Sequence, residues 1–373
     1  MVETSKAMPR SLNSLQVLRG VAATMVVFYH TYLILAQPEY IGQEIFGGVA
    51  SRGWLGVNLF FVLSGFIILH AHSKDIGRPE AIKNYAIKRF IRVYPIYWVF
   101  MIAYMLAASA GLGYPNFEWS TVNLISAFTL IKFAEPLTLP LRVAWTLFYE
   151  ITFYAMFVLF LINRKLAIAA FSAWAVVILI SVFLFDKRDM GLLNVWNLYF
   201  PAGMLAYLGF RYLSPRLGPA VLLAGIVLLG VMAATDLGAR ATLAGNYPTS
   251  LLALALPCIM IILGATLWER QARWNTPRVL NLLGEASFSI YLVHSGVLSL
   301  AAILYVKLQL TFISPVACFF LAAGASVVAG VIAHLLIEIP VLERLRRFLL
   351  KRTQHRPSSL ATVAEDNRAQ EKV

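Results

Sequence analysis

Long apolar runs dominate the sequence and constrain what the chain can fold into. A helix needs about 20 mostly apolar residues to cross the hydrocarbon core of a bilayer. Ten runs of about this length occur, at residues 15–36, 54–70, 93–112, 143–162, 166–185, 193–210, 217–235, 249–268, 286–305 and 312–336. Of the 373 residues, 60% are hydrophobic and 13% are charged, whereas soluble domains carry about a quarter charged residues. The sequence therefore predicts an all-α polytopic membrane protein, a bundle of about ten transmembrane helices.

The positive charges indicate how such a bundle lies in the membrane. If the N-terminus is cytoplasmic, most of the 31 lysines and arginines lie on the cytoplasmic side, in alternate connections and in the C-terminal tail. This asymmetry follows the positive-inside rule, so we expect both termini in the cytoplasm. The net charge of +13 then reflects the orientation of the chain and a cytoplasmic rim of basic residues that contacts membrane phospholipid. We therefore expect no nucleic-acid partner.

The sequence indicates a single folded domain. Residues 1–343 contain all the apolar runs and predict one transmembrane domain, whereas residues 344–373 predict a basic cytoplasmic tail, a helix end followed by a disordered stretch. Residues 74–92 are amphipathic and predict a cytoplasmic helix that runs into the third span. The long outer connection, residues 113–142, is expected to lie over the membrane surface as a partial lid. Cys258 and Cys318 lie in apolar runs without metal-ligand spacing, so no metal site is expected.

Two ionisable residues lie within the first apolar run. Arg19 and His30 are eleven residues apart, which on a helix is three turns plus about 20°, so both side chains point the same way. Ionisable side chains are costly in hydrocarbon and mark functional sites. Imidazole is the usual side chain for proton transfer, which makes His30 a candidate catalytic residue. In the alternative interpretation, His30 is a hydrogen-bonded core residue and Arg19 reaches lipid phosphates.

A pair of arginines marks the inner end of the third span. Arg89 and Arg92 are three residues apart and lie on adjacent faces of one helical turn. Two guanidinium groups so placed can clamp a phosphate or pyrophosphate of a cytosolic donor through charge-assisted hydrogen bonds. The alternative is a membrane anchor that binds anionic lipid.

A carboxylate lies inside the fourth span, in the segment WTLFYE at residues 145–150. Glu150 is expected at a depth like that of His30, where it can orient the imidazole or stabilise its charge. Thr146 shares the face of Glu150, and Trp145 begins the segment, so both are candidates for lining the same cavity. A structural ion pair is the alternative for Glu150, and an interfacial aromatic belt is the alternative for the tryptophan.

Three further polar residues are candidates for lining this cavity. Ser64 lies beside a glycine in the second span, where small residues allow helices to approach closely, so packing is the favoured interpretation there. Tyr291 and His294 lie on adjacent faces of the ninth span. A hydrogen-bonded core pair is equally compatible with their spacing.

Taken together, these motifs resemble the acyltransferase 3 family of membrane O-acyltransferases. The resemblance rests on Arg19 and His30, on GVNLFFVLSGF at residues 56–66, on Arg89 and Arg92 before a Tyr-Pro pair, on WTLFYE, and on FSIYLVH at residues 288–294. It extends from about residue 15 to about residue 343, and the first two motifs are similar to exopolysaccharide acetyltransferases of the ExoZ type. The family's tryptophan motif usually has serine where this chain has Thr146.

The resemblance implies an activity. It implies a ten-helix bundle in the bacterial inner membrane that transfers acetyl, or another acyl group, from cytosolic acetyl-CoA to a sugar hydroxyl. No cofactor is expected to stay bound, because acetyl-CoA acts as a substrate. The acceptor is expected to be a glycan or a lipid-linked saccharide, and other polysaccharide-biosynthesis proteins are candidate partners. In the family the histidine matched by His30 is thought to be catalytic, and the arginines matched by Arg89 and Arg92 are implicated in donor use.

These residues suggest a mechanism and leave alternatives. The donor's phosphates would bind Arg89, Arg92 and Arg19, and His30, held by Glu150, would deprotonate the hydroxyl or carry the acetyl group itself. The main alternative is a proton-coupled transporter of lipid or polysaccharide, in which Arg19, His30 and Glu150 form a proton pathway. A channel-like or scaffolding subunit of an export complex is a third possibility. The chain lacks the repeat symmetry that many transporters show.

Overall fold

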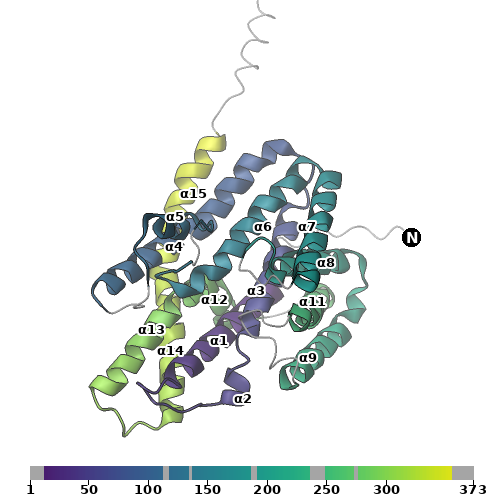
Figure 1. Ribbon diagram of the computed structural model, residues 1–373. Coiled ribbons are helices and arrows are strands. Elements are labelled where there is room, and N and C mark those ends of the chain that lie inside the picture. Colours follow the sequence, from purple (N-terminus) through teal and green to yellow (C-terminus); the bar gives the residue numbers. More distant parts are fainter. Residues whose placement is uncertain are drawn as a thin grey trace, which may run out of the picture.

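A computed structural model describes residues 12–111, 117–133, 137–185, 191–235, 248–272 and 276–354. Within these residues the chain is helical, as predicted (Figure 1). The helices are α1 (Asn13–Leu35), α2 (Gly47–Ala50), α3 (Leu55–His72), α4 (Ile82–Ser109), α5 (Thr121–Thr129), α6 (Trp145–Ile162), α7 (Arg164–Leu184), α8 (Tyr199–Tyr212), α9 (Gly218–Ala234), α11 (Pro248–Gln271), α12 (Arg278–Glu285), α13 (Ser287–Lys307), α14 (Pro315–Ala333) and α15 (Ile339–Gln354). Nine helical stretches in the described part of the chain are long and apolar enough to cross a membrane. The chain is therefore a polytopic helical membrane protein.

One of the ten predicted spans is shorter than expected. The run at 193–210 begins with a 3-10 turn, Val195–Leu198, because the Asn194 side chain accepts a hydrogen bond from the Trp196 backbone N–H at 3.0 Å. This turn leads directly into α8, whose regular α-helix has 14 residues. Helix α8 packs against α3, and its Tyr199 and Phe200 are inaccessible to solvent.

Two glycines allow α3 and α8 to pack closely. A Cβ added to Gly65 would collide with the carbonyl oxygen of Phe200, and one added to Gly203 would collide with the carbonyl oxygen of Val62. Small residues at such crossings let helix backbones approach within van der Waals contact in membranes. The packing role expected for the Ser-Gly pair of the second span thus belongs to Gly65.

This crossing gives a stability prediction. Gly65→Ala is expected to lower the free energy of unfolding by about 1–3 kcal/mol, because backbone rather than a flexible side chain occupies the space. Gly324→Ala, in the interior of α14, is the matched control, since nothing lies within 4 Å of its added Cβ. Thermal unfolding of the purified variants in one detergent compares them. Equal melting temperatures for Gly65→Ala and the wild type would contradict the packing role.

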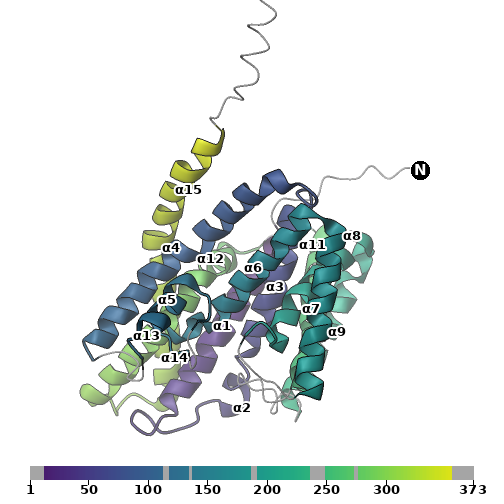
Figure 2. The ribbon, with the colours of Figure 1, turned by 45° about the horizontal axis from the view of Figure 1, so that its top comes forward.

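Helix α4 joins the amphipathic segment to the third span without a break. It begins at Ile82 and continues through Pro95 to Ser109. The middle of α4 is hydrogen-bonded to α5. The Tyr94 hydroxyl donates to the carbonyl oxygen of Thr129, and the Tyr97 hydroxyl donates to that of Ala127, each at 2.7 Å. These carbonyls belong to the last turn of α5, where no partner within the helix exists. The described part of the outer connection therefore lies beside α4 and not over the end of the bundle as a lid (Figures 1 and 2).

A carboxylate of α11 holds the start of α1. The backbone N–H groups of Asn13 and Ser14 donate to the two carboxylate oxygens of Glu269 at 2.8 and 2.9 Å, and the Ser14 hydroxyl donates at 2.6 Å. The first N–H groups of a helix lack partners within the helix, and α1 has no cap from its own Leu12. Arg19, less than two turns later, is thereby fixed relative to α11.

The C-terminal segment begins with a helix. A π-helical turn, His334–Glu338, joins α14 to α15, and α15 continues through Gln354. Residues 344–354, where the sequence predicts a basic helix end, are helical, while residues 355–373 lie outside the described part. Val341, Leu342 and Leu345 pack α15 onto the core, and the helix then projects from the bundle (Figure 2). Such apolar spacing stabilises a helix by burial against its neighbours.

Candidate functional site

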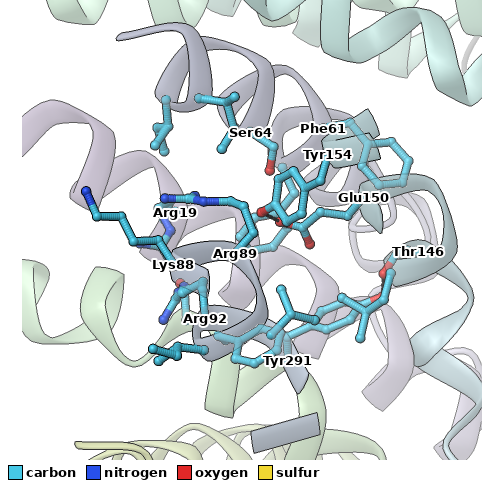
Figure 3. Close-up of a pocket in the computed structure, with 18 of the residues that line it drawn as sticks. Arg19, Phe61, Ser64, Lys88, Arg89, Arg92, Thr146, Glu150, Tyr154 and Tyr291 are labelled. Atoms are coloured by element: carbon cyan, nitrogen blue, oxygen red, sulfur yellow. Dashed lines mark hydrogen bonds between the residues drawn. The ribbon is translucent and has the colours of Figure 1, made fainter. Parts of the chain in front are cut away.

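A cavity of about 470 Å³ opens among α1, α3, α4, α6 and α13, beside the first turns of α15. Its lining brings together charged residues that are far apart in the sequence (Figure 3). The cationic lining residues are Arg19, Lys88, Arg89, Arg92 and Arg346. Glu150 is the one carboxylate among the described residues that line it. An excess of positive charge in a partly enclosed space favours an anionic ligand.

The lining residues differ in solvent exposure, which defines an open mouth and a buried floor of the cavity. Lys88 and Arg346 are exposed, so they mark the mouth. Thr146 and Tyr291 are buried, so they mark the floor. Arg19, Arg89 and Arg92 are partly buried between these two levels. Figure 3 shows the same order, with Lys88 on one side, Glu150 and Tyr154 in the centre, and Thr146 beside Tyr291 on the other side.

Arg89 is held by aromatic rings and not by a carboxylate. Its guanidinium carbon lies 5.9 Å from the ring centre of Tyr85 and 5.7 Å from that of Tyr154. Cation–π contacts of this kind position the charge without neutralising it. The Nε atom of Arg89 is buried and has no hydrogen-bond partner within the described residues. A buried donor without a partner is costly, so this atom is available to a ligand oxygen.

Arg92, in contrast, has a carboxylate partner that is completely buried. Its Nη1 atom lies 2.6 Å from Oε1 of Glu338, whose side chain has 0% exposure. The other oxygen of Glu338 accepts hydrogen bonds from Ser289 Oγ and from His334 Nδ1, each at 2.8 Å. These contacts satisfy the buried carboxylate and fix Arg92 against α13 and the π turn. The two arginines of the motif therefore differ, because within the described residues Arg92 has a carboxylate partner and Arg89 has none.

Glu150 does not contact His30. Its Oε1 atom instead accepts the hydroxyl hydrogen of Tyr154, one turn later on α6. Glu150 lines the cavity, whereas His30 is not among the residues that line it in the described part of the chain. The predicted contact between this carboxylate and the imidazole is therefore wrong. Similar depth on two helices does not bring two side chains together when the helices present them to different sides.

The partner of His30 is His294. The Nδ1 atom of His30 lies 3.0 Å from the carbonyl oxygen of Val26 and 3.2 Å from Nε2 of His294. The Nδ1 atom of His294 lies 3.2 Å from the carbonyl oxygen of Ile290. Because a carbonyl oxygen only accepts, neutral rings in this arrangement carry their hydrogen on Nδ1. His30 is then left with an unprotonated Nε2, the form of imidazole that can accept a proton.

Tyr291 connects this histidine pair with the floor of the cavity. Its hydroxyl donates to the carbonyl oxygen of Val143 at 2.7 Å and lies 2.9 Å from Thr146 Oγ1. Its ring centre lies 5.8 Å from that of His294, which in turn lies 4.8 Å from that of His30. His294 is fully buried, whereas His30 is partly exposed. The ring of Tyr291 therefore lies between the floor residue Thr146 and the histidine pair.

The other predicted site residues divide between the cavity wall and the core. Ser64 lies on the wall. Trp145 does not, because its ring packs against Tyr149 and Trp196 at 5.9 and 5.8 Å. His294 is also behind the wall and not on it. Sequence reasoning missed Tyr154, although a tyrosine four residues after Glu150 shares its helix face.

No group of three or more His, Cys, Asp or Glu side chains within the described residues is arranged to hold a metal ion. The candidate site is therefore a cavity with a cationic wall, a carboxylate–tyrosine pair in its centre and a histidine pair beyond its floor.

Comparisons with known proteins identify the family of the chain. A family model described as an acyltransferase domain matches residues 12–335. The exopolysaccharide production protein ExoZ of Rhizobium meliloti (strain 1021) is 28% identical over 310 residues, which cover 78% of this chain and 90% of that protein. Protein 2 in the picA locus of Rhizobium radiobacter is 30% identical over 172 residues, which cover 41% of this chain and 84% of that protein. No solved structure matches the chain.

Proposed function

Because the chain belongs to the acyltransferase 3 family, we propose that it transfers an acetyl group from cytosolic acetyl-CoA to a sugar hydroxyl of a surface polysaccharide or exopolysaccharide. The observation that carries this proposal is the cavity with its cationic wall. Its charges suit a donor with several phosphates, and its depth suits a long arm ending in a thioester. The similarity to ExoZ, an exopolysaccharide production protein, supports a saccharide acceptor.

The cavity mouth faces the cytoplasm in this proposal. Lys88, Arg89 and Arg346 lie at the end of the bundle where α1 begins and α15 projects. Most of the chain's lysines and arginines lie at that end, and the positive-inside rule places such an end in the cytoplasm. Both termini then lie in the cytoplasm, and a bacterial chain of this kind lies in the inner membrane. Cytosolic acetyl-CoA reaches the mouth directly.

The reaction itself is acyl transfer from sulfur to oxygen. The unprotonated Nε2 of His30 takes the proton of the sugar hydroxyl, and the resulting oxygen attacks the thioester carbonyl carbon. The carbon–sulfur bond then breaks, and the leaving thiolate of CoA takes the proton from the imidazolium. The products are an acetyl ester and CoA with a free thiol. His30 acts as a base here, while an acetyl-histidine intermediate is the alternative route.

Two groups are given supporting roles in this reaction. His294 keeps the Nδ1 hydrogen of His30 in place, so that the basic nitrogen remains Nε2. Tyr291 is part of the floor and lies between the cavity and this pair, so its side chain has to shift for the thioester to reach His30. Glu150 and Tyr154 lie beside the path of the donor's arm and supply hydrogen-bonding groups to its amides.

A labelled donor tests the proposal. Purified protein in detergent, given acetyl-CoA labelled in the acetyl group and delipidated surface glycan, is expected to move the label to the glycan. Alkaline hydrolysis should then release it as acetate, because an O-ester is labile to base. A transporter needs a sealed membrane and would leave the glycan unlabelled. Mass spectrometry of the glycan from a deletion strain provides the independent readout, in which loss of an acetyl substituent is expected and an unchanged glycan would contradict the proposal.

A further inference from the structure

The last described helix places one arginine at the mouth of the cavity. Arg346 lies one turn after Leu342, on the side of α15 that packs against the core, and it lines the cavity. Arg347, the next residue, lies on a different side, where it pairs with Glu343 at 3.0 Å and keeps 69% of its side chain exposed. Adjacent arginines of one helix therefore meet different surroundings, and only the first faces the site.

The charges of the cavity form two levels. Lys88 and Arg346 are exposed, and neither has an ion pair within the part of the chain that the structure describes. Deeper in, Arg89 and its neighbours are partly buried, and the unpartnered Nε atom of Arg89 marks that level as ready for an anion. Two separate levels of positive charge along one cavity suit a ligand that carries two separate anionic groups.

We infer that Lys88 and Arg346 form an outer phosphate subsite, which binds a terminal phosphomonoester of the acyl donor. This inference rests on the proposed function. A CoA thioester carries a diphosphate in its chain and a further phosphate on the 3′ position of its ribose. When the thioester points to the floor at Thr146 and Tyr291, the diphosphate lies at the level of Arg89 and the 3′-phosphate lies at the mouth. The guanidinium fork of Arg346 then matches two phosphate oxygens.

The position of α15 supports this assignment. Helix α15 follows the π turn, in which Glu338 forms an ion pair with Arg92 of the cavity wall at 2.6 Å. This ion pair holds the first turns of α15 close to the site. Leu342 and Leu345 pack on the core directly before Arg346. Arg346 lies beyond residues 12–335, which the family model matches. The outer phosphate subsite is therefore completed by a part of the chain outside the matched domain.

Two donors that differ only in this phosphate test the inference. The full-length protein in detergent is assayed with acetyl-CoA and with acetyl-3′-dephospho-CoA. The wild type is expected to show a KM about tenfold to a hundredfold higher for the dephospho donor, because a charge-assisted contact is lost. Arg346→Ala should raise the KM for acetyl-CoA by a similar factor, with kcat unchanged and the KM for the dephospho donor unchanged. Arg346→Lys should recover part of the loss.

Arg347→Ala is the matched control, since it removes an adjacent arginine that does not face the cavity. It should leave both KM values at their wild-type levels. Equal KM values for the two donors in the wild type would overturn the subsite, as would an equal rise for both donors in Arg346→Ala. Altered binding to anionic vesicles with unchanged KM would assign Arg346 to lipid instead and would also overturn it.

The subsite can fail separately from the proposed function. Calorimetric binding of CoA and of 3′-dephospho-CoA measures the phosphate contact without any transfer. If no acetyl transfer occurs but Arg346→Ala removes the preference for CoA, the outer phosphate subsite stands and the reaction is wrong. If transfer occurs and neither assay shows a preference, the subsite is wrong and the reaction stands.

Discussion

Replacing His30 with alanine is expected to lower kcat for acetyl transfer by about 100-fold to 10,000-fold, the range that a general base contributes. The KM for acetyl-CoA should stay near the wild-type value, because His30 does not line the cavity that would hold the donor. The ring of His30 contacts those of Tyr29 and His294, so the folded amount of each variant has to be measured beside its rate. Rates with purified protein, corrected for the folded amount in size-exclusion chromatography, provide the measurement.

The neighbouring histidine sharpens this test. His294→Ala should also lower kcat, but by less than His30→Ala, because His30 retains the contact with the Val26 carbonyl oxygen that holds its Nδ1 hydrogen. His72→Gln is the control, since His72 lies in the last turn of α3 and pairs with Asp75 at 2.8 Å, away from the histidine pair. Full activity of His30→Ala would rule out His30 as the base. Equal losses in His30→Ala and His72→Gln would show a structural effect only.

The second large effect is expected at Glu338. Glu338→Ala leaves Arg92 and His334 without their buried partner, which typically destabilises a protein by about 3–5 kcal/mol. The released Arg92 would also lose its position in the wall, so the KM for acetyl-CoA should rise. Thermal unfolding in detergent and steady-state kinetics measure the two consequences on the same preparation.

A second charge pair provides the control for this prediction. Glu343 and Arg347 also form an ion pair, at 3.0 Å, but their side chains are 56% and 69% exposed. Glu343→Ala should therefore change stability little, because water and salt screen such pairs. Replacing both Arg92 and Glu338 with leucine should restore much of the stability but not the KM, since no buried charge is left unpaired. A double variant as unstable as Glu338→Ala would contradict the paired-charge explanation.

The sequence predicts the spans well because the bilayer imposes their length and apolarity. The start of α8 differs from the prediction because an asparagine cap converts the first turn of that run to 3-10 geometry, a local contact that hydropathy does not contain. The length of α15 is less predictable, because Val341, Leu342 and Leu345 contact a core that only the folded bundle creates.

The candidate site was predictable within single helices and not between them. Helical spacing paired Arg89 with Arg92, because residues of one turn keep a fixed relation to each other, and the family resemblance added the donor role. The contact of His30 with His294 depends on how α1 and α13 are rotated against one another, which no one-helix argument supplies. Depth alone suggested Glu150 as the partner. Arg346 was missed for the same reason, since its approach to the cavity depends on where α15 docks.

The π turn between α14 and α15 has a consequence for how such chains can diverge. A turn of this type holds one more residue than an α-helical turn and commonly marks a functional position. Deleting one residue from His334–Glu338 would rotate everything after it by about 100° relative to α14. The bundle would keep its spans, but Arg346 would leave the mouth of the cavity. A single-codon deletion or insertion at this joint would therefore change the register of the terminal helix and also move Glu338 relative to Arg92.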